Sequence, residues 1–311
     1  MKALSENKLD KAAAGDLDTL VTLDDLGLLL GPDEALDAYV TRLRTLLNNL
    51  EQLDAELRAQ GAVDFFGIQL VRDDAIPNEL GQAARRLTKR LYGFSIDWVP
   101  GFFTDARMGL LFAGCAFYPQ DSFLPVFIVR KAFQHHEKWW IYTRTELLAH
   151  ELTHIAHLGF RTLDFEEHFA FQTATSAFRR LAGGMFRTPR DTYLLLGAMA
   201  TVLLAQLVNI RVRPPEKVWT MPFPLIFAAG LGTALWVVLR YAWHRRRLAR
   251  ARRGVATVFG ADAALPVLVR CSQPEIRALA ALPSEQVPAW FERQAQASLR
   301  WQVIRRKFGR G

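Results

Sequence analysis

Cysteine is nearly absent from the sequence, since Cys115 and Cys271 are the only two in 311 residues. They are far apart and form no CxxC pattern, which argues against a disulfide-stapled secreted domain and indicates a reducing compartment. Proline and glycine number 14 and 20, too few for a fibrous protein, while 50% hydrophobic residues are too many for a disordered chain. Residues 1–18 have no apolar core, so we expect neither a signal peptide nor a transit peptide there.

Charge is absent from two long runs, residues 192–210 and 218–239. As helices, both runs are long enough to cross the ~30 Å hydrocarbon core of a bilayer. The intervening RVRPPEK contains two prolines and predicts a turn, so we interpret the pair as a transmembrane hairpin. Aromatic residues gather near the ends of the runs, as is typical of membrane interfaces: Tyr193, Trp219, Trp236, Tyr241 and Trp243.

Basic residues are distributed unevenly around this hairpin. Eleven arginines flank it at 179–190 and 240–253, against three basic residues at 211–217. The positive-inside rule predicts a multi-pass membrane protein with both termini in the cytoplasm, at the inner membrane if the protein is bacterial. The net charge of +8 comes in large part from the arginines after residue 240, which we expect to meet anionic lipid headgroups. Their position beside a span accounts for the charge, so we expect no nucleic-acid partner.

The rest of the chain divides into regions before and after the hairpin. We expect an N-terminal helical region at 1–62, a domain at 63–190, the hairpin at 191–243, and a basic juxtamembrane segment with a helical region at 244–311. Apolar periodicity predicts helices at 34–60, 78–92, 142–158 and 165–182, and shorter helices after residue 261. Runs rich in Phe, Val and Ile predict strands at 94–100, 110–119 and 124–133.

Histidine is scarce, yet six of the seven lie between residues 135 and 168. His150 and His154 enclose Glu151 in an HExxH motif. Positions i and i+4 share one face of a helix, so both imidazoles can reach one ion. The adjacent carboxylate can take a proton from a metal-bound water. The motif therefore predicts a Zn²⁺ site with Glu151 as the catalytic general base.

A catalytic zinc requires a third protein ligand, for which the downstream sequence offers five candidates: His157, Asp164, Glu166, Glu167 and His168. With a glutamate-bearing helix after HExxH, the chain resembles the gluzincin metallopeptidases, whose third ligand is a glutamate in an ExxA pattern. Glu167 and Ala170 match that pattern, and Glu166 is the alternative ligand. Phe171 stands where the family usually has an aspartate.

The order of predicted elements also resembles the compact minigluzincins and, less closely, the membrane-embedded HtpX-type peptidases. The resemblance covers residues 78–182 and implies an α+β zincin-like catalytic domain, here joined to a two-helix transmembrane hairpin and a small helical C-terminal region. It implies that His150, His154 and Glu167 bind zinc. It also implies an edge strand that pairs with extended substrate, for which residues 110–118 are the candidate.

These features predict a membrane-anchored zinc endopeptidase acting on protein or peptide substrates at the cytoplasmic face. The alternative is a catalytically silent or latent membrane scaffold with the same fold, and the intact Glu151 favours the enzyme. A transporter ranks last, because the two spans contain no ionisable residue. Small residues in the spans leave oligomerisation open: Gly197, Ala228, Gly230, Gly232 and Ala234.

Overall fold

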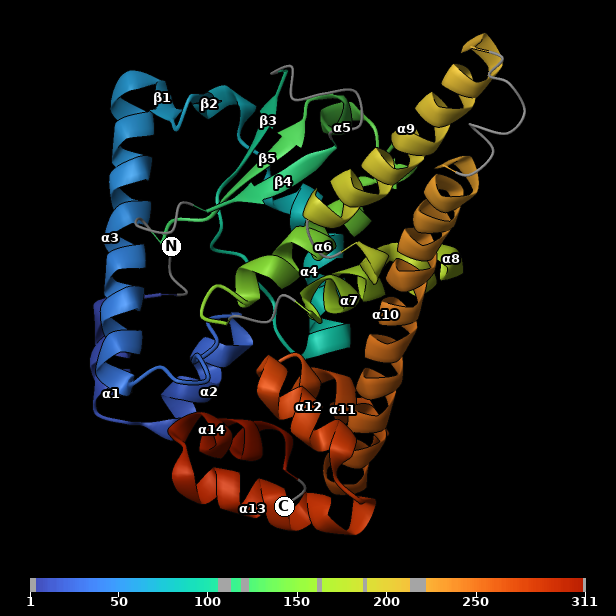
Figure 1. Ribbon diagram of the computed structural model, residues 1–311. Helices are drawn as coiled ribbons and strands as arrows, with labels where there is room; N and C mark the ends of the chain where they lie inside the picture. The colour runs from blue at the N-terminus through green and yellow to red at the C-terminus, as the bar shows by residue number, and fades with distance from the viewer. Residues whose placement is uncertain are drawn as a thin grey trace.

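The computed structural model describes residues 4–105, 113–118, 123–160, 164–186, 189–212 and 222–309. Over these residues the protein is mostly helical, with three small sheets and two helices long and apolar enough to cross a membrane (Figure 1). Residues 213–217 of the expected turn, residues 218–221 at the start of the second run, and residues 110–112 and 119 of the second predicted strand lie outside the described residues. So do three of the basic residues counted above: Arg187, Arg213 and Lys217. Arg211 and Val212, expected in the turn, are helical.

The N-terminal region is helical, with α1 (Glu6–Ala13), α2 (Leu17–Asp25) and α3 (Leu36–Gln60). Helix α3 confirms the helix predicted at 34–60. It ends at Gly61, whose φ of +76° is readily adopted by glycine. Helices α1 and α2 were not predicted, because helices of 8 and 9 residues depend on tertiary packing for their stability. A hairpin of β1 (Ala62–Phe65) and β2 (Ile68–Val71) follows α3.

A three-stranded sheet lies against the next helices. Its order is β3 (Gly101–Thr104), β5 (Val126–Arg130) and β4 (Gly114–Phe117), with β5 parallel to β3 and antiparallel to β4. Helix α4 (Asn78–Tyr92) confirms the helix predicted at 78–92 and ends at Gly93. The second and third predicted strands are confirmed in part by β4 and β5. Among the described residues, β4 forms one edge of the sheet.

The strand predicted at 94–100 is wrong. Phe94, Ile96 and Trp98 are buried in alternation, which is the pattern that suggested a strand. The segment instead bonds to the end of α2: the Ser95 N–H donates to the Asp25 carbonyl at 2.8 Å, and the Trp98 indole donates to the Leu26 carbonyl at 2.9 Å. Alternating burial here belongs to an extended segment that lies in the core and pairs with no strand of a sheet among the described residues.

Helix α6 (Arg144–Ala156) confirms the helix predicted at 142–158 and carries the HExxH motif. It follows α5 (Ala132–His135) and a small hairpin of β6 (Lys138–Trp139) and β7 (Tyr142–Thr143). The single helix predicted at 165–182 is wrong, because the chain forms α7 (Glu166–Ala170), η2 (Phe171–Thr173), α8 (Ala177–Ala182) and η3 (Gly183–Met185). The break follows extended Ala174, where the Thr175 N–H donates to the buried Glu146 carboxylate.

Helices α9 (Pro189–Val212) and α10 (Pro222–Phe259) pack side by side and expose apolar side chains over most of their paired length (Figure 1). Helix α10 has 38 residues and is ~57 Å long at 1.5 Å per residue. It continues well past the apolar run and includes the arginines at 240–253, so the division expected at 243/244 falls inside a helix. At the base of the pair, Arg240 forms two hydrogen bonds with Asp191, at 2.8 and 2.9 Å.

The last four helices pack beside the lower part of α10 and the N-terminal region: α11 (Ala261–Leu268), α12 (Gln273–Ala281), α13 (Val287–Ala297) and α14 (Leu299–Phe308). A buried ionic network joins α2 to this C-terminal region. Asp24 accepts from Arg270 and from Lys307, each at 2.6 Å; Asp24 and Arg270 are buried, and the Lys307 side chain is 9% exposed. Residues before and after the α9–α10 pair therefore share one core (Figure 1).

Candidate metal centre

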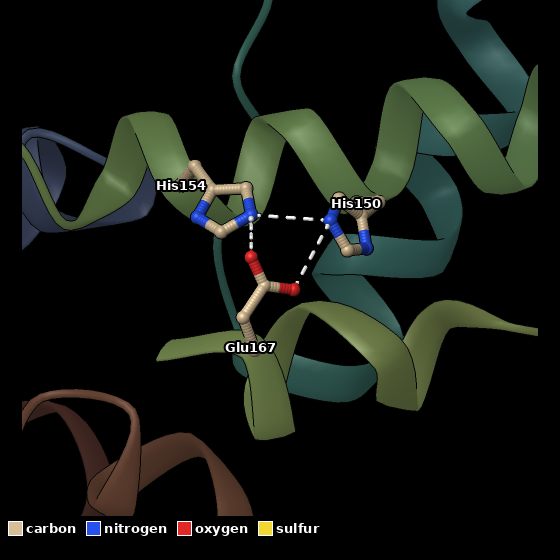
Figure 2. A group of neighbouring side chains, drawn as sticks. All are labelled: His150, His154 and Glu167. Atoms are coloured by element: carbon tan, nitrogen blue, oxygen red, sulfur yellow. Dashed lines mark hydrogen bonds and ion pairs between the residues drawn. The ribbon is translucent and has the colours of Figure 1, made fainter. Parts of the chain in front are cut away.

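Helix α6 presents the HExxH histidines to α7. Thr143 accepts a hydrogen bond from the Glu146 N–H and begins the helix. The apolar face of α6 is buried in the core through Leu148, Leu152 and Ile155. His150 and His154 lie on another face, one turn apart, and point toward α7 (Figure 2).

The two histidines and Glu167 of α7 form a compact cluster (Figure 2). The Nε2 atoms of His150 and His154 are 3.1 Å apart, and the Glu167 carboxylate faces both: its Oε2 lies 3.6 Å from Nε2 of His150 and its Oε1 lies 3.6 Å from Nε2 of His154. A tetrahedral zinc ion with bonds of ~2.0–2.1 Å separates its ligand atoms by ~3.3–3.4 Å. Two imidazoles and one carboxylate are also a donor set of catalytic zinc sites. The residues present therefore fit such an ion.

Glu166 has a different position from Glu167. Its Oε1 lies 2.7 Å from Nδ1 of His154, on the opposite side of the ring from Nε2. A carboxylate in this position fixes the tautomer and orientation of a metal-binding histidine. Phe171 stands where the gluzincins usually have an aspartate, and it packs its ring 4.8 Å from that of His150. The carboxylate that orients a histidine is supplied instead by Glu166 of α7.

The charges of the cluster are strongly coupled. Burial disfavours the charged form of His154, but the hydrogen bond that its ring donates to Glu166 and the charge of Glu167 outweigh burial and raise the pKa of His154 to about 9. Burial raises the pKa of Glu167 to about 7. Burial and the neighbouring His154 hold the pKa of His150 well below its usual value. Protons and a metal cation thus compete for the same ring nitrogens and carboxylate.

Glu151 lies between α6 and the sheet. Its Oε2 accepts a hydrogen bond from the Ala116 N–H at 2.8 Å, on the side of β4 that does not pair with β5. Burial raises the pKa of this carboxyl group. The expected general base is thus beside the edge strand expected to pair with substrate, and Tyr118 at the end of that strand is partly exposed.

The other three candidate ligands lie away from the cluster. Nε2 of the buried His157 is 2.7 Å from the Val269 carbonyl oxygen, which links the end of α6 to the C-terminal region. Asp164 pairs with Arg277 of α12. His168 stacks on Tyr241 of α10, with ring centroids 5.0 Å apart. These residues join α6 and α7 to the C-terminal helices.

One buried ion pair next to the cluster was not predicted. Glu146 is almost fully buried, and it pairs with Arg179 of α8. Arg179 also lies over the ring of Tyr142 and lowers the pKa of His150. The position of Glu146 three residues after Thr143 suggests an exposed capping residue, and no local signal connects it to a residue 33 positions away.

Comparison with models of protein families, with curated proteins and with solved structures found no match to this chain. The function is therefore argued from the geometry of the site and its surroundings.

Proposed function

We propose that this protein is a membrane-anchored zinc endopeptidase with a gluzincin-like, zincin-type catalytic domain. The observation that carries the proposal is the convergence of Glu167 with both HExxH histidines, while Glu151 lies beside the free side of β4. The ligands come from two separate helices, so the cluster is more than the local consequence of a motif. His150, His154 and Glu167 would hold the ion, and Glu166 would orient His154.

Zinc bound by these residues supplies a Lewis acid that makes water acidic and polarises a peptide carbonyl. Glu151 is the general base: its carboxylate takes the proton from the attacking water and later gives it to the leaving amine. Its raised pKa suits both transfers, and the Ala116 N–H orients one oxygen. An extended substrate would pair with β4 by backbone hydrogen bonds.

The membrane anchor is the α9–α10 pair. Its two helices expose apolar side chains and are long enough to span a bilayer. The segments before and after the pair share one core, which supports an even number of crossings and the same side of the membrane for both. The excess of flanking arginines favours the cytoplasmic side, for both termini and the catalytic domain.

The arginines of α10 differ in their distance from this membrane boundary. At 1.5 Å per residue, Arg245 and Arg246 lie ~8–9 Å along the helix beyond Arg240, whereas Arg253 lies ~20 Å beyond it. Since the Debye length is ~8 Å at physiological ionic strength, the nearer arginines account for most of the attraction to anionic headgroups.

The test is zinc content together with cleavage. Wild type, His150→Ala and Glu151→Gln are purified in detergent, zinc per chain is counted, and each protein is incubated with casein. We expect bound zinc and chelator-sensitive cleavage in the wild type, loss of both in His150→Ala, and zinc without turnover in Glu151→Gln. Full activity of Glu151→Gln would refute the mechanism. Zinc without cleavage in the wild type would support the scaffold, and absence of zinc would refute the metal site.

A further inference from the structure

Two elements beside the metal centre expose large apolar side chains. Trp140 and Ile141 form the turn between β6 and β7 and are 58% and 54% exposed. Phe178 and Leu181 share one face of α8 and are 74% and 50% exposed. We call these four residues the apolar collar. A soluble surface rarely gathers side chains of this size without a partner.

The turn of the β6–β7 hairpin is unusual in its composition. Trp140 has a φ of +52°, in the left-handed region that is unfavourable for bulky residues. A two-residue hairpin turn with positive φ at its first central position normally has glycine there. Trp140 takes that position here, and the side chains of Trp140 and Ile141 project from the tip instead of entering the core. Trp140 and Ile141 are therefore candidates for a functional contact.

The collar is continuous with the base of the proposed spans. Arg179 of α8 lies over the ring of Tyr142 in β7, so the two collar elements adjoin. Helix α8 is followed directly by η3, and η3 contacts α10. The guanidinium of Arg240 donates to the Met185 carbonyl of η3 as well as to Asp191. The apolar part of α10 ends at Arg240, and Arg240 bonds to Met185, four residues after Leu181 of the collar. The collar therefore lies close to the base of the proposed spans.

The collar is also tied to the metal cluster. A Cβ atom added at Gly183 would lie 2.2 Å from the ring of Phe171, so η3 and η2 are in close contact. Phe171 in turn packs against the ring of His150. Arg179 pairs with Glu146, one turn before His150 on α6. A displacement of the collar would therefore be transmitted to α6, the helix that carries the HExxH motif.

We propose that the apolar collar lies in the headgroup layer of the same bilayer that the α9–α10 pair crosses. Exposed aromatic and aliphatic side chains, with basic Lys138 and Arg180 nearby, suit this layer. The collar holds the metal centre at the membrane surface. Resting on the proposed function, this placement makes the substrate a polypeptide segment next to the membrane anchor of another protein, rather than a freely diffusing chain.

The depth of the collar is measured without reference to catalysis. In a Cys115→Ala background, single cysteines replace Trp140, Ile141, Phe178 and Leu181, while Cys271 is fully buried. Each single-cysteine variant is labelled with a nitroxide and placed in nanodiscs of phosphatidylcholine and phosphatidylglycerol. We expect collisions with oxygen to exceed those with a water-soluble nickel chelate at all four positions. Phe66, 64% exposed on the β1–β2 turn and also at positive φ, is the matched control and should favour the chelate.

Equal access of the nickel chelate to the collar and to Phe66 would overturn the proposal, whether or not the protein is a peptidase. The substrate class is tested with one peptide sequence supplied free or joined to a membrane anchor. The double variant Phe178→Glu/Leu181→Glu should lose roughly tenfold or more in cleavage of the anchored peptide and keep wild-type cleavage of the free one. Equal loss on both peptides would overturn the role in substrate capture, and Phe66→Glu is the control.

Discussion

The positions of Glu166 and Glu167 predict unequal losses of zinc affinity when each is changed to glutamine. Glu167 faces both Nε2 atoms at 3.6 Å, whereas Glu166 contacts only Nδ1 of His154, at 2.7 Å. Glutamine keeps the shape of the side chain and removes its charge. The two variants therefore separate a direct ligand from a positioning residue that acts through a histidine.

The expected size of each loss follows from these contacts. Removing the partner of a metal-bound histidine lowers metal affinity ~10–100-fold. That factor corresponds to ~1.4–2.7 kcal/mol at 1.36 kcal/mol per tenfold change. Glu166→Gln should fall in this range. Glu167→Gln removes a charged ligand itself, so its loss should exceed that of Glu166→Gln.

Zinc affinity is measured by competition with a chromophoric chelator, with protein in detergent at neutral pH. Thermal unfolding of the two metal-free proteins is the control for folding. A greater loss in Glu166→Gln than in Glu167→Gln would reverse the assignment of ligand and positioning residue. Unchanged affinity in both variants would show that zinc is held elsewhere.

Three further predictions concern the residues that hold the site in place. Burial opposes ionisation of Asp24, but the charges of Arg270 and Lys307 outweigh burial and hold the pKa of Asp24 below its usual value. The ionised Asp24 therefore stabilises the fold above pH ~4, and this stabilisation is lost as the pH falls below that value. Asp24→Asn should lower the free energy of unfolding by ~3–5 kcal/mol and flatten its decline in acid, and an unaltered acid profile would contradict the network. His157→Phe leaves the Val269 carbonyl without its donor and should cost ~1–3 kcal/mol in thermal or denaturant unfolding while zinc per chain stays the same; loss of zinc would make His157 a ligand. A double-mutant cycle of Asp191→Asn and Arg240→Gln should give a coupling energy of ~0.5–3 kcal/mol in detergent unfolding, and additive effects would show that the pair does not fasten the base of the hairpin.

Local signals predicted the elements whose ends are encoded nearby. Helix α4 ends at Gly93 because its C-cap lies in the left-handed region, and a glycine can be recognised from sequence. The break after Ala174 was missed because it depends on the Glu146 carboxylate, 29 residues away from the N–H that it accepts. Alternating apolar residues at 94–100 correctly indicated burial but not the hydrogen-bond partners of the backbone, which lie in α2.

The sequence by itself determined the two membrane-length helices and the shared face of His150 and His154. Composition suffices for the first, and the i, i+4 spacing of a helix for the second. Only the tertiary structure decided that Glu167 meets both imidazoles while Glu166 meets the far side of one, because neighbours on a short helix diverge in direction. It also decided that His157 bonds to the Val269 carbonyl in the core. Asp24 and Arg270, 246 residues apart, form an ion pair between the N-terminal and C-terminal regions. Such contacts depend on how helices pack, which no local pattern encodes.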